Sequence, residues 1–230
     1  MIKVLQGWQE IGDSILTLQS KGLPTHATAQ KNWDHYLLYD ALASTGKQAA
    51  IADLGCGEGH TLVLLHALGF KNLFGVDFQI NWKLKARRFL SMWREKTLKP
   101  PFNLRAGDII KTPYRSDFFD VAISISTIEH GVDAESFLAE AHRILKPGGL
   151  LFITTDYWEE KIATDDSRLA FGLPWQVFCR EQIEMIVKTA DKIGLSACDK
   201  TTIPACSERP VFWQSSNYTF IAMLFKKSGA

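Results

Sequence analysis

The sequence predicts an α/β protein built around a parallel β-sheet that is covered by helices. From about residue 50 onward, short apolar runs rich in β-prone residues alternate with longer segments of helical period. The short runs show little alternation of polar and apolar residues, as expected of strands that are buried on both faces. The chain has 230 residues, 46% of them hydrophobic, which suits one domain with one substantial core.

The expected strands follow one another at intervals that leave room for a helix between them. In chain order they are 49–54, 72–77, a short segment before Gly107, 120–126, 149–155 and 218–227. Glycines and polar residues lie near the ends of several of these runs, as they do at the ends of strands in folded proteins.

Three helices are predicted from apolar residues at helical spacing. We expect the first stripe to be a buried face, with basic residues on the other side; it consists of Trp82, Ala86, Phe89, Leu90 and Trp93. The second stripe follows a possible N-cap at Asp133, ends before 146–149 and consists of Phe137, Ala141, Ile144 and Leu145. The third is expected to end at a C-cap, Gly194, and consists of Ile183, Ile186, Val187, Ala190 and Ile193.

Two regions do not follow the alternation of strand and helix. We expect residues 1–48 to form a helical appendage or lid, and residues 49–230 to form the main domain. Within that domain, 156–179 is predicted to be irregular. Both regions are aromatic and polar at once, which is typical of a lid or of the wall of a binding site.

Composition excludes several classes of protein. The 26 Lys and Arg residues nearly balance 25 Asp and Glu residues, so the net charge of +1 gives no long-range attraction for nucleic acid or an anionic surface. The four cysteines show no CxxC spacing, which argues against a disulfide framework or a zinc site. We expect a cytoplasmic protein, since neither a signal peptide nor a run of about 18 apolar residues is visible. The sequence does not indicate the oligomeric state.

The strongest motif is the glycine-rich segment 53–59, which lies between the first expected strand and a helical run. Gly55 and Gly57 suit backbone angles that a Cβ would resist, and they let a ligand approach the main chain. The position three after Gly57 is His60, so the spacing of a dinucleotide fingerprint is absent. Asp53 directly before the loop can meet a cation, which favours a ligand with an amino-acid end.

Two further acids follow the next expected strands. Asp77 ends the second strand, where a carboxylate can accept hydrogen bonds from both hydroxyls of a ribose. The neighbouring Phe78 could pack on adenine. Asp108 follows the third strand, within reach of an exocyclic amine. With the loop, these residues describe a site for an adenosyl amino acid.

These motifs, together with 119–124 and 143–150, resemble those of class I S-adenosylmethionine-dependent methyltransferases over about residues 50–156. The resemblance implies a Rossmann-like, mostly parallel sheet of seven strands with an antiparallel last strand and helices on both faces. It implies S-adenosylmethionine as cofactor, with Asp53 and the loop holding its methionine part, Asp77 its ribose and Asp108 its adenine. The full set of expected cofactor contacts is Asp53, Gly55, Cys56, Gly57, Gly59, Asp77, Phe78, Asp108, Ile109 and Ser126.

His130 is the best candidate for a general base, because its intrinsic pKa is near neutral and it follows the fourth strand. Glu129 is the second candidate. The alternative is that this pair only organises the loop or touches the cofactor. Some relatives bind a metal through a Glu at the position of Ser126, so we expect no metal here.

The acceptor is expected to be a small molecule or a glycan, methylated at oxygen, and nucleic acid is not favoured. The expected acceptor walls are aromatic: Trp33, Tyr36, Tyr157, Trp158 and Trp175. The alternative is that these rings only cover the sheet and the N-terminal segment.

Two other functions remain open at this point. One is a non-catalytic domain that binds S-adenosylmethionine and docks a partner through Trp8, Trp33 or Trp213. The other is an RNA methyltransferase, suggested by basic residues around the first apolar stripe, which are Lys83, Lys85, Arg87, Arg88, Arg94, Lys96 and Lys99. A solvated helix face is the favoured explanation of those residues.

Overall fold

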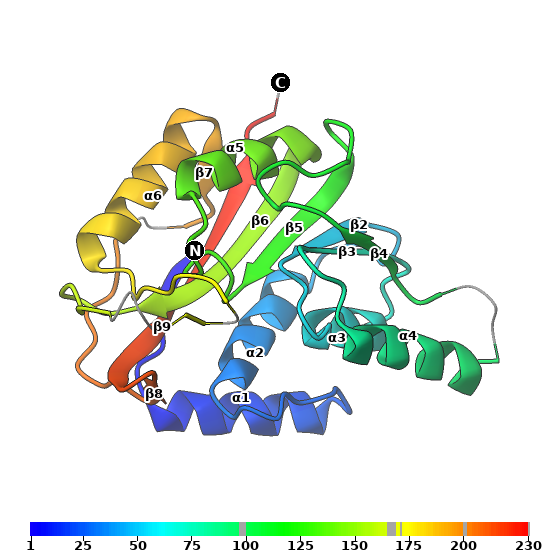
Figure 1. Ribbon diagram of the computed structural model, residues 1–230, viewed down its shortest axis with the longest axis horizontal. Helices are drawn as coiled ribbons and strands as arrows, with labels where there is room; N and C mark the ends of the chain where they lie inside the picture. Colours follow the sequence, from blue (N-terminus) through cyan, green and yellow to red (C-terminus); the bar gives the residue numbers. More distant parts are fainter. Residues whose placement is uncertain (97–99, 165–168, 171, 200–201, 230) are drawn as a thin grey trace.

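The chain folds around one twisted sheet with helices on both sides, as the computed structural model in Figure 1 shows. The structure describes residues 1–96, 100–164, 169–170, 172–199 and 202–229. The strand order across the sheet is β1-β9-β6-β5-β2-β3-β4, and two further strands, β7 and β8, pair with β9.

The strands predicted from sequence are present. The parallel ones are β2 (Ala50–Leu54), β3 (Asn72–Asp77), β4 (Asn103–Ala106), β5 (Phe119–Ile125) and β6 (Leu145–Tyr157). The strand β9 (Ser216–Lys227) runs antiparallel to β6, which confirms the expected direction of the last strand. β6 is longer than predicted, because pairing begins at Leu145, before the glycines at 148 and 149.

The described sheet has nine strands where the sequence predicts seven. The three short strands that carried no visible signal are β1 (Ile2–Val4), β7 (Leu195–Ala197) and β8 (Val211–Trp213). β1 and β7 pair side by side along β9, opposite 221–223 and 225–227. Each has three residues, which is too few to show the two-residue period of a strand.

Two hydrophobic cores lie on the two faces of the sheet. Alternate residues of β5 supply both, since Val121 and Ile123 face one core while Ala122 faces the other. The first core packs against α1 (Trp8–Ser20), α2 (Lys31–Ala41), α3 (His60–Ala67) and α4 (Trp82–Arg94). The second packs against α5 (Ala134–Ile144) and α6 (Arg180–Lys192). Figure 1 shows the two groups of helices on either side of the sheet.

Helices α5 and α6 have the buried faces and the ends that the sequence predicts. Asp133 caps α5, since its carboxylate accepts a 2.9 Å hydrogen bond from the backbone N–H of Ser136. Gly194 follows α6 with a φ of +87°, the left-handed conformation that favours glycine after a helix.

The prediction for α4 is wrong in one respect. The helix forms where expected, but the stripe from Trp82 to Trp93 is exposed, and the buried residue of the helix is Leu84. Helical spacing shows which residues share a face, whereas it does not show whether another part of the chain covers that face. Among the described residues, none of the helices combines the length and the apolarity needed to cross a membrane.

Candidate functional site

The glycine-rich loop connects the buried strand β2 to α3. Gly55, Gly57 and Gly59 have φ angles of +84°, +46° and +74°, so all three adopt the left-handed conformation expected of glycine. A Cβ at Gly55 would come within 2.3 Å of the Thr127 side chain, and one at Gly59 within 2.2 Å of Leu84. A Cβ at Gly57 would meet no described atom within 4 Å. Packing therefore requires two of the glycines, and Gly57 alone faces open space.

The loop is held against the end of β3. The backbone N–H groups of Gly55 and Cys56 donate to the carbonyl of Val76 at 2.8 and 3.1 Å. The N–H of Gly57 donates to Oδ2 of Asp77 at 2.9 Å. The Cys56 side chain is buried, and burial raises the pKa of its thiol, so this residue does not offer a ligand a thiolate.

Asp53 is a buried acid whose Oδ2 has no hydrogen-bond partner among the described residues. Burial, with a smaller contribution from the nearby Asp77 carboxylate, raises the pKa of Asp53 to about 8. An isolated carboxylate of this kind is costly to ionise unless a cation joins it. The site therefore fits a ligand with a positive charge close to Asp53.

Asp77 and Asp108 lie next to each other at the carboxyl edge of the sheet, as predicted. The N–H of Gly107 donates to the Asp77 carbonyl at 2.9 Å, which joins the two strand ends. Asp108 accepts from the N–H of Ile110 at 3.0 Å, and this contact fixes its side chain. Phe78 is exposed beside Asp77, whereas Ile109 is buried. An open loop, an unpaired buried acid and two strand-end acids thus fit the expected adenosyl amino acid.

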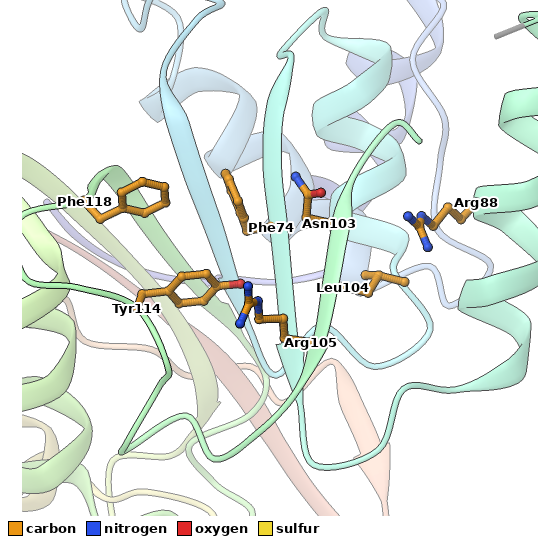
Figure 2. Close-up of a pocket in the computed structure, with 7 residues that line it drawn as sticks. All are labelled: Phe74, Arg88, Asn103, Leu104, Arg105, Tyr114 and Phe118. Atoms are coloured by element: carbon orange, nitrogen blue, oxygen red, sulfur yellow. The ribbon is translucent and has the colours of Figure 1, made fainter. Parts of the chain in front are cut away.

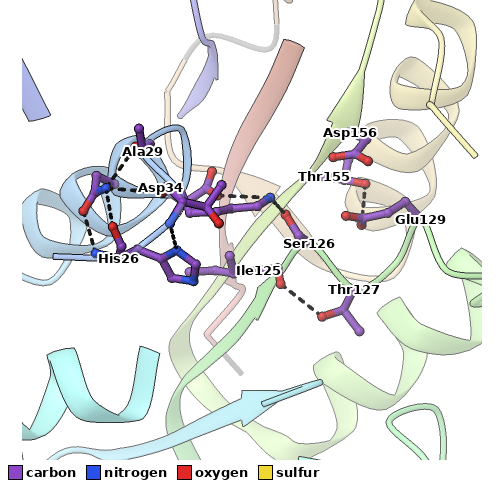
Figure 3. Close-up of polar contacts among 12 residues, drawn as sticks. His26, Ala29, Asp34, Ile125, Ser126, Thr127, Glu129, Thr155 and Asp156 are labelled. Carbon is purple, nitrogen blue, oxygen red and sulfur yellow. Dashed lines mark hydrogen bonds and ion pairs between the residues drawn. The ribbon is translucent and has the colours of Figure 1, made fainter. Parts of the chain in front are cut away.

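A second polar cluster lies at the ends of β5 and β6, and it includes residues that the sequence analysis missed. Lys31, at the start of α2, donates a hydrogen bond to Oγ of Ser126 and lies 3.6 Å from Oδ2 of Asp34. Its ammonium also lies 3.7 Å from the centre of the Phe220 ring. Ser126 has a φ of +48°, so the chain turns sharply where β5 ends. Figure 3 shows Ser126 between Asp34 and the sheet residues of this cluster.

Two buried acids complete the cluster. Oε2 of Glu129 accepts a 2.9 Å hydrogen bond from the hydroxyl of Thr155 (Figure 3). Oδ2 of Asp156 accepts from the indole N–H of Trp175 at 2.8 Å. Burial raises the pKa of both carboxyl groups, and the charge of Lys31 opposes that shift. The cluster can therefore hold protons near neutral pH.

His130 follows Glu129 and is partly buried. Its backbone N–H donates to the Thr127 carbonyl at 3.0 Å, and its ring lies edge-on to Trp213 at 6.5 Å. Burial lowers the pKa of His130 to about 4, with a smaller contribution from Lys31. The imidazole is consequently neutral at pH 7 and has a nitrogen that can accept a proton.

The expected aromatic walls are only partly brought together. Trp33 donates from its indole N–H to Oε2 of Glu10 at 3.1 Å, and it lines a hollow of about 600 Å³ together with Tyr36. Val4, which also lines this hollow, pairs with Ile221, and Ile221 pairs with Thr155. The hollow therefore lies near the carboxyl end of β6.

The other three expected wall residues lie in different surroundings. Trp175 contacts Asp156 in the polar cluster, with its ring 4.9 Å from that of Trp213. Trp158 is buried beneath the guanidinium of Arg209, 3.9 Å from its ring centre. Tyr157 belongs to the core on the α5 and α6 side, so the structure does not place it with Trp175. Phe171, within the expected irregular segment 156–179, lies outside the described residues, as does Lys99.

A separate hollow of about 420 Å³ lies at the β4 edge of the sheet (Figure 2). Phe74, Tyr114 and Phe118 form its aromatic side, and Arg105 lies 5.7 Å from the centre of the Tyr114 ring. None of the residues that line it belongs to the glycine loop or to the polar cluster.

Lys31, Asp34 and Asp156 are the functional candidates that sequence reasoning did not select. A signal was present for the first two, because the segment 26–36 stands out as aromatic and polar at once. Their partners Ser126 and Glu129 lie about a hundred residues further along the chain, so sequence spacing could not pair them. Within the part of the chain that the structure describes, no group of three or more His, Cys, Asp or Glu side chains is arranged to hold a metal ion.

Comparison with known proteins relates this site to one family. Residues 52–153 match the methyltransferase domain family. A probable S-adenosylmethionine-dependent methyltransferase from Mycolicibacterium smegmatis is 25% identical over 121 residues, which are 53% of this chain and 43% of the relative. The chain spans less than half the length of the first curated relatives it matches.

Solved structures show the same fold over nearly the whole chain. The 1,6-didemethyltoxoflavin-N1-methyltransferase of Burkholderia thailandensis has a TM-score of 0.64 at 15% identity and covers 95% of this chain and 87% of its own. The cyclase SpnF has a TM-score of 0.63 at 15% identity and covers 99% of each chain. The Rossmann-like fold is therefore shared by proteins whose names describe different chemistry.

Proposed function

We propose that this chain, which contains a domain of the class I S-adenosylmethionine-dependent methyltransferase family, transfers a methyl group to a hydroxyl oxygen of a small molecule or glycan. The observation that carries the cofactor assignment is the unpaired buried oxygen of Asp53 close to the open space at Gly57. When bound, S-adenosylmethionine supplies an electrophilic methyl group on a positively charged sulfur.

Three acidic residues are assigned to three different parts of the cofactor. Asp53 and the open space at Gly57 suit the amino-acid end, Asp77 suits the ribose hydroxyls, and Asp108 suits the adenine. Because the Gly57 N–H already holds one oxygen of Asp77, that carboxylate is oriented before any ligand arrives. A site that is ordered in advance loses less entropy on binding.

His130 is the residue that we assign to the acceptor. A hydroxyl must lose a proton as it becomes a nucleophile, and a neutral imidazole can accept that proton. Burial lowers the pKa of His130 to about 4, so the ring is neutral at pH 7 but is a weaker base than an exposed histidine, and the assignment rests on its position shortly after β5. The neighbouring Glu129, whose pKa burial raises to about 8, is mostly protonated at pH 7 and so adds little negative charge next to His130 in the chain.

We further propose that residues 1–48 act as the lid over this site. The ring of His26 lies 4.1 Å from that of His60, at the start of α3, while Lys31 bonds to Ser126 at the end of β5. The segment thus contacts both the loop side and the acceptor side. Such a cover excludes water, which methyl transfer requires.

The test compares two histidine variants with the same panel of acceptors. Turnover is measured as labelled methyl transfer to phenols, sugars, glycans and amines, and binding as calorimetry with S-adenosylhomocysteine. His130→Ala should lower transfer to a hydroxyl acceptor by roughly 10²–10⁴-fold while changing the affinity by less than about threefold. The matched control His142→Ala, on α5, should change neither quantity. Equal losses of turnover and binding in His130→Ala would remove the catalytic role.

A second candidate is a cofactor-binding domain that performs no methyl transfer. It is favoured by the similarity in fold to a protein that is named a cyclase. In that case the protein binds S-adenosylhomocysteine and methylates no acceptor of the panel, and His130→Ala has no turnover to lose.

A further inference from the structure

Helix α4 presents a wide apolar face to solvent. Trp82, Phe89, Leu90 and Trp93 are 72%, 67%, 59% and 75% exposed. Large aromatic residues are rarely exposed together on a soluble protein unless the face has a partner. At about 100° per residue their positions fall within about 100° of one another, so they lie along one side of the helix.

The opposite side of α4 anchors the helix to the protein. Leu84 is buried against Gly59, and it lies about 200° around the helix from Trp82. Lys83 bonds to Glu58 at 2.5 Å, and Arg87 donates to the Glu58 carbonyl at 3.1 Å. The aromatic side is therefore directed away from the body of the molecule.

The charges of α4 are all positive. The helix sequence WKLKARRFLSMWR has five Lys or Arg residues and no Asp or Glu, although the whole chain is nearly neutral. Lys85 and Arg94 are exposed and lie on opposite sides of the apolar stripe, while Lys83 is paired with Glu58. The arrangement is that of a helix lying flat in a membrane interface, with an apolar centre and a basic rim.

We propose that α4 docks onto a bilayer surface that carries anionic headgroups. Tryptophan, phenylalanine and leucine would enter the acyl boundary, while the basic rim would meet the headgroups. An RNA partner fits less well, because nucleic acid needs the positive charge at the centre of the contact and this centre is apolar. The proposal concerns binding alone and does not depend on methyl transfer.

The docked orientation has a consequence for the candidate site. Helix α4 begins four residues after Phe78, and its first turn is bonded to the glycine loop through Glu58. A membrane at α4 would thus lie beside the cofactor site. Acceptors dissolved in, or attached to, the bilayer would then be concentrated where the site opens.

The experiment is co-sedimentation of the full chain with phosphatidylcholine vesicles, with and without phosphatidylglycerol. Wild-type protein should bind the anionic vesicles and not the neutral ones. Its tryptophan emission should shift to the blue as Trp82 and Trp93 leave water. The double variant Lys85→Gln, Arg94→Gln should lower binding by roughly 25-fold, since each basic residue at such a surface contributes about fivefold. The variant Phe89→Ser, Trp93→Ser should lower it by more than about tenfold.

The controls lie on the exposed side of α6. Met185→Ser and Lys188→Gln remove one apolar and one basic side chain of similar exposure, and they should leave vesicle binding unchanged. Circular dichroism and binding of S-adenosylhomocysteine establish that each variant is folded. The proposal is overturned if wild-type protein ignores anionic vesicles, if the α4 variants bind as wild type does, or if α4 binds single-stranded RNA and no vesicle.

Discussion

Asp53 links the sequence pattern to the chemistry of the site at the scale of a single residue. Its position at the end of the first parallel strand could be predicted, because an acid directly before a glycine loop is visible in the sequence. Its protonation could not be predicted, since the raised pKa depends on burial and on Asp77 from another strand. The same limit applies to Lys31, whose contact with Ser126 joins segments far apart in the chain.

The raised pKa of Asp53 leads to a test of cofactor binding against pH. At pH 7 the ligand-free carboxyl group, with a pKa of about 8, is mostly protonated, and a bound cation favours its ionised form. Binding should therefore release a proton and should tighten as the pH rises from about 6 to about 8. The measurement is calorimetry with S-adenosylmethionine in buffers of different ionisation enthalpy.

Asp53→Asn is the matched control, because it keeps the shape of the side chain and removes the titrating group. The variant should release fewer protons than wild type, and the remainder reports the ionisation of the ligand itself. Equal proton release by both proteins contradicts a cation at Asp53.

At the scale of elements, the segment from β2 through the loop to α3 shows which features a sequence pattern predicts. The glycines of the loop predict left-handed backbone conformations, and the φ angles of all three glycines agree. They do not reveal that the side chains of Thr127 and Leu84 occupy the space where a Cβ of Gly55 or Gly59 would lie, because both neighbours come from other elements. The same limit applies to helix α4. Its helical period was visible in the sequence, whereas the exposure of its apolar stripe was not.

The difference between the glycines predicts two distinct mutant behaviours. Gly57→Ala should cost only about 1 kcal/mol of stability from its positive φ, and it should weaken binding of S-adenosylhomocysteine by more than about tenfold. Gly55→Ala should lower the free energy of unfolding by about 1–3 kcal/mol more than Gly57→Ala does, because its Cβ would overlap the Thr127 side chain. Urea unfolding and calorimetry measure the two quantities. Unchanged affinity in Gly57→Ala would show that no ligand lies against that glycine.

At the scale of the whole molecule, the N-terminal segment is integrated with the sheet and with one of the two cores. It contributes β1 to the sheet through pairing with β9, two helices to one core, and Lys31 to the polar cluster. The parallel direction of the predicted strands followed from the alternation of strand and helix signals, and the antiparallel last strand followed from the family resemblance. The three short strands around β9 did not, because their pairing is decided by contacts between distant parts of the chain.

The central claim is that the carboxyl edge of this sheet binds S-adenosylmethionine through the loop, Asp53 and Asp77. Calorimetry of the purified protein with S-adenosylhomocysteine tests it most directly. We predict saturable binding of one ligand per chain, weakened at least about tenfold in Asp77→Ala. A folded wild-type protein that takes up neither S-adenosylhomocysteine nor S-adenosylmethionine would contradict the account.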